Sequence, residues 1–241
     1  MRPETDIAAR TDRRARLLVA AFAGVLLWAL TACQAQLTPD GKPYKIVVSG
    51  NRLYVTNTLS GNNNREALWS STTATASDSQ ECARWVSGVG LSQNGLAFRI
   101  RSDSGGWDAV VLERNIWMRA FWMFKVIYFH SGSGQKSLFD VAPQDADLSG
   151  YLGKSTVSDV YPLRVCAQIT GNVLRFAVAK GADPMVPLGT AGRGAVLTLA
   201  PPSTMRQPGE TGTYVGHIPN FATSVVDSIT INGTPAPMPN T

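Results

Sequence analysis

Residues 117–130 read WMRAFWMFKVIYFH, and this stretch indicates the fold more clearly than any other part of the chain. Successive side chains of a β-strand point to opposite faces of a sheet, so a strand here would have two different faces. One face would be wholly apolar, with Met118, Ala120, Trp122, Phe124, Val126 and Tyr128. The other would mix aromatic and cationic groups, with Trp117, Arg119, Phe121, Lys125, Ile127 and Phe129. A helix is the alternative, but the β-branched and aromatic content and the shared parity of the two cations favour a strand.

The same alternation occurs in neighbouring segments. Residues 95–101 (GLAFRIR) and 107–113 (WDAVVLE) predict two strands joined by a turn. Gly171-Asn172 separates the apolar runs 163–169 and 173–179, which is typical of a β-hairpin. At least nine such short segments follow residue 32, and none of them is convincing as a helix. We therefore predict an all-β fold, a two-sheet antiparallel β-sandwich of the jelly-roll type.

The chain divides into four predicted parts. Residues 1–32 form a signal peptide with a helical apolar core, residues 33–43 a tether, residues 44–232 the sandwich, and residues 233–241 a Pro-rich disordered tail. Two stretches inside the sandwich, the polar residues 57–80 and the acidic residues 139–150, are predicted to be irregular.

The N-terminal segment has the order of a bacterial export signal. Four arginines within residues 10–16 precede an apolar run, residues 17–30 (LLVAAFAGVLLWAL), and then Thr31, Ala32 and Cys33. As a helix this run is about 21 Å long, whereas a spanning helix must cross roughly 30 Å of hydrocarbon. The tetrapeptide Leu30-Thr31-Ala32-Cys33 resembles the lipobox, in which the cysteine receives a diacylglycerol before cleavage. We expect a lipid anchor on Cys33 and a location on the extracytoplasmic face of the membrane; an ordinary secretory signal with a coincidental cysteine is the alternative.

Charge and cysteine content limit the partners. Loss of residues 1–32 removes five Lys/Arg and three Asp/Glu, which leaves 17 against 14 and a net charge of +3. The remaining chain contains no Lys/Arg run, so a nucleic-acid partner is not expected. Cys82 and Cys166 are predicted to form a disulfide, because export leads to an oxidising compartment; two unpaired buried thiols are the alternative.

Four segments carry a family resemblance: residues 95–101, 115–122 (NIWMRAFW), 212–219 (GTYVGHIP) and 226–231 (VDSITI). Together with the hairpin at Gly171, they resemble the concanavalin A-like lectin/glucanase (laminin G-like) superfamily, in the form found in exported actinobacterial lipoproteins. The resemblance implies two curved sheets, with a sugar chain on the concave face of one. On that basis the candidate ligand-binding residues are Trp117, Arg119, Phe121 and Lys125. The alternative is that these side chains pack under loops or cover the edge of the sandwich.

The sequence offers little support for catalysis. Glucanases of the superfamily carry Glu-x-Asp-x-x-Glu on one strand, and this motif is absent from the sequence. Asp108 and Glu113 are five residues apart, which places them on opposite faces of one strand. Asp145 and Asp147 share a parity but fall in a stretch predicted to be a loop. No cofactor is expected, although a structural calcium ion on Asp103, Asp108 or Asp227 is an open alternative.

Three interpretations of function follow. The first is a membrane-anchored, non-catalytic lipoprotein that binds a glycan or another component of the cell envelope. The second is a glycan-active hydrolase of the same fold with a non-standard carboxylate pair. The third is a structural module that binds protein.

Overall fold

The computed structural model describes residues 44–58, 66–87, 93–103, 106–114, 121–132, 138–154, 160–216 and 221–238. The predicted signal-peptide helix, the tether, Cys33, Trp117 and Arg119 lie outside these residues. Among the described residues, no helix is long and apolar enough to cross a membrane.

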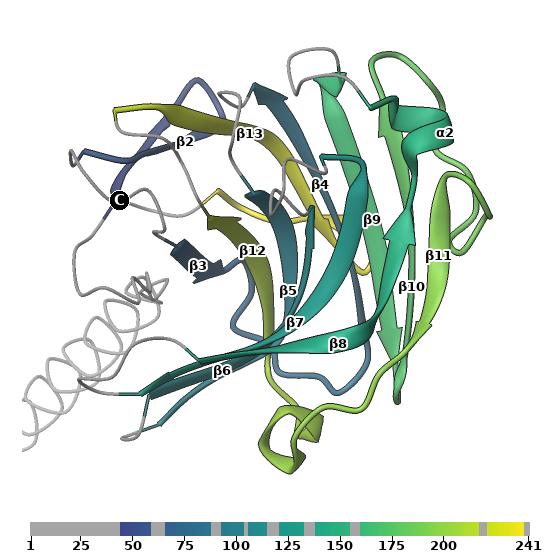
Figure 1. The fold of residues 1–241 in the computed structure, drawn as a ribbon. Coiled ribbons are helices and arrows are strands. Elements are labelled where there is room, and N and C mark those ends of the chain that lie inside the picture. Colours follow the sequence, from purple (N-terminus) through teal and green to yellow (C-terminus); the bar gives the residue numbers. More distant parts are fainter. Residues whose placement is uncertain are drawn as a thin grey trace, which may run out of the picture. The chain divides into compact units, whose positions relative to one another are not determined.

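The described chain forms two antiparallel sheets, which confirms the predicted β-sandwich (Figure 1). The eight-stranded sheet has the order β1-β2-β13-β4-β9-β10-β11, and β14 pairs with β13. The six-stranded sheet has the order β3-β12-β5-β6-β7-β8. Two short helical turns, α2 (Ser149–Leu152) and η3 (Ser203–Arg206), lie in the connections.

The strands of the eight-stranded sheet are β1 (Lys45–Ser49), β2 (Arg52–Thr56), β4 (Ser79–Ser87), β9 (Leu163–Thr170), β10 (Val173–Lys180), β11 (Gly194–Thr198), β13 (Thr223–Ile231) and β14 (Thr234–Pro235). Those of the six-stranded sheet are β3 (Glu66–Ser70), β5 (Gln93–Asp103), β6 (Gly106–Arg114), β7 (Met123–Gly132), β8 (Leu138–Asp147) and β12 (Glu210–Gly216).

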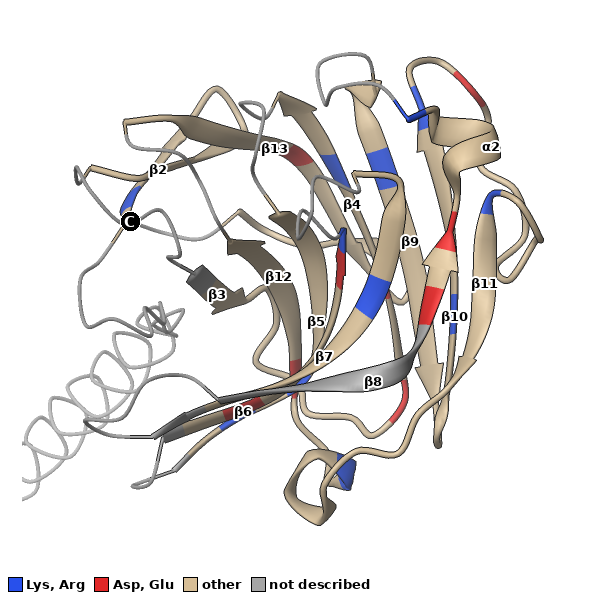
Figure 2. Ribbon diagram, viewed as in Figure 1, with Lys and Arg blue, Asp and Glu red and all other residues tan. Residues whose placement is uncertain are grey.

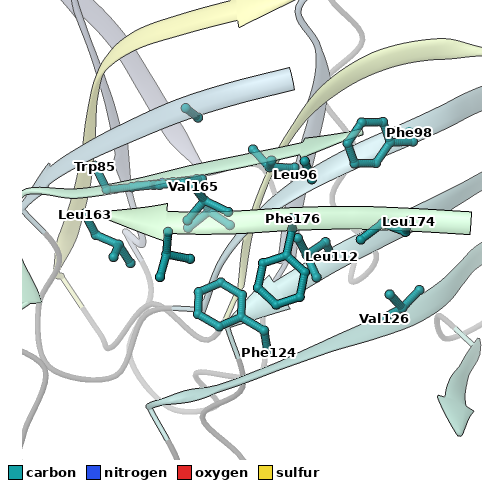
Figure 3. Packing of buried hydrophobic residues seen from close by; sticks show 14 of the residues in the cluster. Trp85, Leu96, Phe98, Leu112, Phe124, Val126, Leu163, Val165, Leu174 and Phe176 are labelled. Atoms are coloured by element: carbon teal, nitrogen blue, oxygen red, sulfur yellow. The ribbon is translucent and has the colours of Figure 1, made fainter. Parts of the chain in front are cut away.

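The main core lies between the two sheets. Phe124 of β7 and Phe176 of β10 are both fully buried, and their ring centroids are 5.3 Å apart (Figure 3). Leu96, Leu112 and Val165 belong to the same apolar cluster. Burying a side chain of this size contributes about 1.5–3 kcal/mol. We call the face of the six-stranded sheet that carries Phe124 its inner face, because it packs against the other sheet.

The hairpin predicted at Gly171-Asn172 is confirmed. Gly171 has a φ of 53°, and β9 and β10 pair from Thr170↔Val173 to Leu163↔Lys180. The disulfide is confirmed as well: Cys82 and Cys166 face each other across β4 and β9 and are bonded. Their neighbours in sequence point into the core, so the disulfide lies on the outer side of the eight-stranded sheet.

The predicted strand over residues 117–130 is partly wrong. Phe121 and Trp122 form a turn, and β7 begins at Met123 and continues to Gly132. The strand begins late because its pairing with β6 ends there. Arg114, the last residue of β6, pairs with Phe124, so the residues before Phe124 have no described partner on β6. From Phe124 onward the predicted alternation holds, because Phe124, Val126 and Tyr128 all lie in the inner cluster.

The stretch predicted to be irregular at residues 139–150 contains β8. This strand is at the edge of the six-stranded sheet, and its register with β7 shifts between Val141 and Asp145, where Pro143 lies. A proline is tolerated at an edge or a bulge, because its missing N–H breaks no interior ladder bond. The polar stretch 57–80 similarly contains β3, which pairs with β12.

The described part of the tail predicted for residues 233–241 contains a turn and the short strand β14 (Thr234–Pro235). Asn232 and Gly233 have φ values of 49° and 79°, the left-handed conformation of a tight hairpin turn. This turn brings β14 back onto β13, and the Ala236 N–H donates to the carbonyl of Ile229 at 2.9 Å. The sandwich therefore extends beyond the predicted boundary at residue 232.

Candidate functional site

The six-stranded sheet has a second buried face, which we call its outer face because it is turned away from the eight-stranded sheet. It carries an apolar cluster of Leu68, Ala97, Ile100, Ala109, Val111, Ile127, Phe129 and Tyr214. The alternation of β7 explains how this cluster arises, since Ile127 and Phe129 have the opposite parity to Phe124. One strand thus supplies apolar side chains to both sides of the sheet.

Next to this cluster, the antiparallel register aligns four hydrogen-bonding side chains and Gly95 across five strands, and Gln93 lies two residues before Gly95 on the same face. Tyr214 pairs with Gly95, Gly95 with Glu113, Glu113 with Lys125, and Lys125 with Asp145. Figure 2 shows the cation on β7 beside the acidic positions of β8. We call Tyr214, Gln93, Glu113, Lys125 and Asp145 the outer-face row.

Gly95 leaves room at the centre of this row. A Cβ atom there would lie 2.6 Å from the carbonyl oxygen of Leu112 and 3.0 Å from the ring of Tyr214. Any larger residue would push the ring of Tyr214 out of its place beside β6. The small residue therefore lets the tyrosine reach the carboxyl and amide groups of the row.

Contacts join the members of the row. Lys125 Nζ lies 3.4 Å from Glu113 Oε1, and Gln93 Nε2 donates a hydrogen bond to the same oxygen at 3.4 Å. The hydroxyl of Tyr214 donates to Gln93 Oε1 at 3.2 Å. Glu113 is 1% exposed and Lys125 7%, whereas Asp145 is exposed at the β8 end of the row. The row thus runs from a buried centre to an exposed carboxylate.

Burial raises the pKa of Glu113 to about 7, because the charged carboxylate is poorly solvated there. The nearby Lys125 and the hydroxyl of Tyr214 oppose this rise in the pKa, and the negative charge of Asp145 adds to it. A carboxyl group with a pKa near 7 can both give and take a proton at neutral pH. Such perturbed carboxyls are typical of functional sites, although buried ion pairs of purely structural role also show them.

The structure places two of the four predicted ligand-binding residues. Lys125 lies on the predicted face, but it is buried and paired with Glu113 instead of being exposed. Phe121 precedes β7 in a turn and is 7% exposed. Trp117 and Arg119 remain predictions, since both lie outside the described residues.

The acidic residues considered in the sequence divide between the two faces. Asp108 and Glu113 have opposite parity on β6, as expected, and Asp108 Oδ1 contacts His130 Nδ1 at 2.5 Å. Asp145 lies in β8 instead of in a loop, so its alignment with Glu113 was missed. The alternation of residues 107–113 already predicts which face of the strand carries Glu113. The sequence does not show that β8 pairs with β7, so it does not predict that Asp145 aligns with Glu113.

The three aspartates suggested as alternatives for calcium lie on three different strands, Asp103 on β5, Asp108 on β6 and Asp227 on β13. Asp108 is on the six-stranded sheet, whereas Asp227 is on the eight-stranded sheet and forms an ion pair with Arg84 at 2.7 Å. Nowhere in the described ranges do three or more His, Cys, Asp or Glu side chains gather as a metal site would require.

Comparisons with known proteins give structural neighbours only. No protein-family model matches the sequence. A comparison with curated proteins also gives no match. A solved structure of the exoplasmic/lumenal domain of VIP36 in a Ca²⁺-bound form is 9% identical, with a TM-score of 0.45 over 86% of this chain and 90% of that one. A prokaryotic β-1,3-1,4-glucanase (lichenase) derived from a mouse hindgut metagenome is 10% identical, with a TM-score of 0.42 over 85% and 94%. Similarity at this level does not bear on function.

Proposed function

We propose that this chain is an exported lipoprotein whose sandwich binds a glycan or another component of the cell envelope. In this proposal a diacylglycerol on Cys33 holds the protein at the extracytoplasmic face of the membrane, and the ligand contacts the outer-face row from its Asp145 end. The observation that carries the binding proposal is the row itself, in which charged and hydrogen-bonding side chains from β12, β6, β7 and β8 lie at one level and Gln93 of β5 contacts two of them.

The anchor rests on the position of Cys33, which only Thr31 and Ala32 separate from a fourteen-residue apolar run. Two acyl chains bind a bilayer firmly, at about 0.8 kcal/mol per buried CH₂. The test is metabolic labelling with a radioactive fatty acid in a bacterium that processes lipoproteins. We expect label in the wild-type chain and none in Cys33→Ser, with the chain moving from the membrane to the soluble fraction. Label that persists in Cys33→Ser would contradict the anchor.

The chemistry of the row suits a ligand with many hydroxyl groups. Lys125 supplies donors, Asp145 accepts, and Glu113 can do either because its pKa is near 7. Hydroxyl groups both donate and accept, so a sugar matches such a mixed row, whereas a purely anionic or cationic ligand does not. Asp145 is the row member that a ligand reaches first, because its side chain is exposed.

A glycan array with the full chain in a sugar-free detergent tests the binding proposal. Asp145→Asn removes the exposed charge of the row, and Asp183→Asn makes the same change in the turn after β10, far along the chain from the row. We expect at least a tenfold weaker signal in Asp145→Asn and an unchanged signal in Asp183→Asn, because hydrogen bonds to a charged group contribute about 1.5–3 kcal/mol. Equal signals from both variants would contradict glycan binding at the outer-face row.

One observation favours the second candidate, a glycan hydrolase. Glu113 has a pKa of about 7, and Asp145 lies on the same face two strands away. Two strand spacings amount to about 9.4–9.8 Å, at the upper limit of the separation found in inverting glycosidases. Inverting glycosidases separate their carboxyl groups by about 6.5–9.5 Å. Glu113 would protonate the leaving oxygen while Asp145 takes a proton from the attacking water, so one C–O bond breaks and another forms.

Reducing-end release from the glycans that bind on the array distinguishes this candidate. A hydrolase would release sugar of inverted anomeric configuration, and Glu113→Gln would abolish the release while binding persisted. Binding without release would leave the non-catalytic proposal.

The buried outer apolar cluster favours the third candidate, a protein-binding or structural module. Phe129 is 0% exposed and Ile127 is 3% exposed, so much of this face is already covered. If the array shows no glycan bound by the wild-type chain, both glycan proposals fail and a protein partner remains.

A further inference from the structure

A second candidate site lies at one end of the sandwich, away from the outer-face row. It is a hollow of about 350 Å³ between the β3–β4 connection and the β13–β14 hairpin. This volume is within the range of roughly 300–1,000 Å³ that small-molecule sites occupy. The lining residues come from both sheets, because Thr211 belongs to β12 and Ser79 to β4.

The floor of the hollow is built from buried hydroxyl groups. The Thr211 hydroxyl donates to Ser79 Oγ at 2.9 Å, and both residues are at least 95% buried. Ser71 is 4% exposed, lines the same hollow, and its Oγ finds no hydrogen-bond partner among the described residues. A buried hydroxyl without a partner costs free energy, and a hydrogen bond to a bound ligand would offset that cost.

Both walls of the hollow are held in place. The Ser71 N–H donates to the carbonyl of Thr211 at 2.9 Å, and Ala76 and Gly209 exchange two backbone hydrogen bonds. On the other side, β14 and the Ala236 N–H bond to β13. A site with fixed walls binds without first ordering its own residues.

The chemistry of the lining selects the class of ligand. Half of the lining residues carry hydroxyl or amide groups, and the other half are apolar: Ala74, Ala76, Ile231, Pro235, Ala236 and Pro237. None of the twelve lining residues is ionisable. Hydroxyls together with apolar C–H surfaces match a sugar ring, which has polar edges and apolar faces, whereas a charged ligand would be buried here without a counter-charge. We propose that this hollow binds one neutral monosaccharide unit.

This proposal is independent of the outer-face row, since the two sites share no residue. The full chain in a sugar-free detergent would be examined by saturation-transfer difference NMR with D-glucose, D-galactose, D-mannose and N-acetyl-D-glucosamine, and with D-glucuronate as a charged comparison. We expect transfer to at least one neutral sugar and none to glucuronate. Absence of transfer to all four neutral sugars would overturn the proposal.

Three variants locate the bound sugar. Ala74→Trp places a large ring at an exposed lining position and should abolish the transfer, whereas Thr73→Trp changes an exposed neighbour that does not line the hollow and should leave it intact. Ser71→Ala should weaken binding about tenfold, since one hydrogen bond is lost. Its thermal midpoint should stay the same or rise, because an unpartnered buried hydroxyl is removed. Transfer that survives in Ala74→Trp, or that disappears in Asp145→Asn, would place the sugar elsewhere and overturn the proposal.

Discussion

Glu81 and Glu113 are both buried, but they lie on opposite sides of the six-stranded sheet and have different neighbours. Glu81 belongs to β4, faces the space between the sheets, and accepts a hydrogen bond from the Thr213 hydroxyl at 3.0 Å. Burial raises the pKa of Glu81 well above its ordinary value, and the neutral donors Thr213 and Ala97 only partly offset this. Glu113 instead has Lys125 at 3.4 Å, and its pKa is about 7.

The difference shows how location changes the role of one residue type. Burial between the sheets raises the pKa of Glu81, which favours its protonated form, and the hydrogen bond from the Thr213 hydroxyl to Glu81 links the two sheets. A carboxyl beside a lysine can change its charge near neutral pH and can therefore respond to a ligand. We interpret the space between the sheets as the stabilising region, and the outer-face row remains the proposed binding site.

The largest expected effect is in the space between the sheets. Phe124→Ala removes a fully buried ring that contacts Phe176, and it should lower the free energy of unfolding by about 3–5 kcal/mol. Phe221→Ala, at a residue that is 68% exposed, is the control and should change stability by less than about 0.5 kcal/mol. Denaturant unfolding of both variants measures this. Equal effects at the two positions would contradict the assignment of the stabilising core.

Lys125→Met tests the outer face. The change leaves Glu113 buried without its cation, and at pH 8 it should cost about 3–5 kcal/mol. At pH 5 the cost should be smaller, because Glu113 is then protonated and needs no counter-charge. Unfolding curves at the two pH values give the comparison. The same loss at both would mean that the pair does not set the ionisation of Glu113.

Glu81→Gln tests the protonated state between the sheets. A carboxyl whose folded pKa lies above its unfolded value of 4.5 stabilises the protein fully below pH 4.5, and this contribution is lost as the pH rises. Each pH unit over which only the unfolded state is ionised lowers stability by about 1.4 kcal/mol. Glutamine does not ionise, so the variant should be more stable than the wild type at pH 7 and should show a flatter pH dependence. A variant that is less stable at pH 7 would show that Glu81 is ionised in the folded protein.

The smallest effect on stability should come from Asp145→Asn. Its side chain is exposed, so the free energy of unfolding should change by less than about 0.5 kcal/mol. If thermal unfolding shows a larger loss, weaker glycan binding by this variant could not be assigned to the row.

Sequence reasoning recovered the parts of the fold that depend on local pattern. The alternation after Phe124, the turn at Gly171 and the pairing of Cys82 with Cys166 all follow from neighbouring residues or from redox chemistry. Strands β3 and β8 were missed. The apolar residues of β3 are too few to show an alternation within a polar stretch, and β8 is an acidic edge strand that contains Pro143. The turn at Asn232-Gly233 does carry a local hairpin signal, but it was masked by the prolines that follow.

The candidate site was predicted only in part for the same reason. The sequence correctly predicted the face of the strand on which Lys125 lies. Its burial and its contact with Glu113 depend on the register of three strands. Glu113 and Asp145 are 32 positions apart in sequence and meet only through β7. The hollow at Ser71 depends on the β3–β4 connection and the β13–β14 hairpin, which are far apart in sequence, and it left no signal in the sequence.

The most direct test of the assignment is NMR on a chain labelled with ¹³C at the side-chain carboxyl of glutamate. A glycan that binds on the array would be titrated into the full chain at pH 7, with Glu113→Gln and Glu81→Gln used to assign the two signals. We predict that the Glu113 signal shifts with saturation at one equivalent while the Glu81 signal stays in place. A shift of Glu81 with Glu113 unchanged would contradict the placement of function on the outer face.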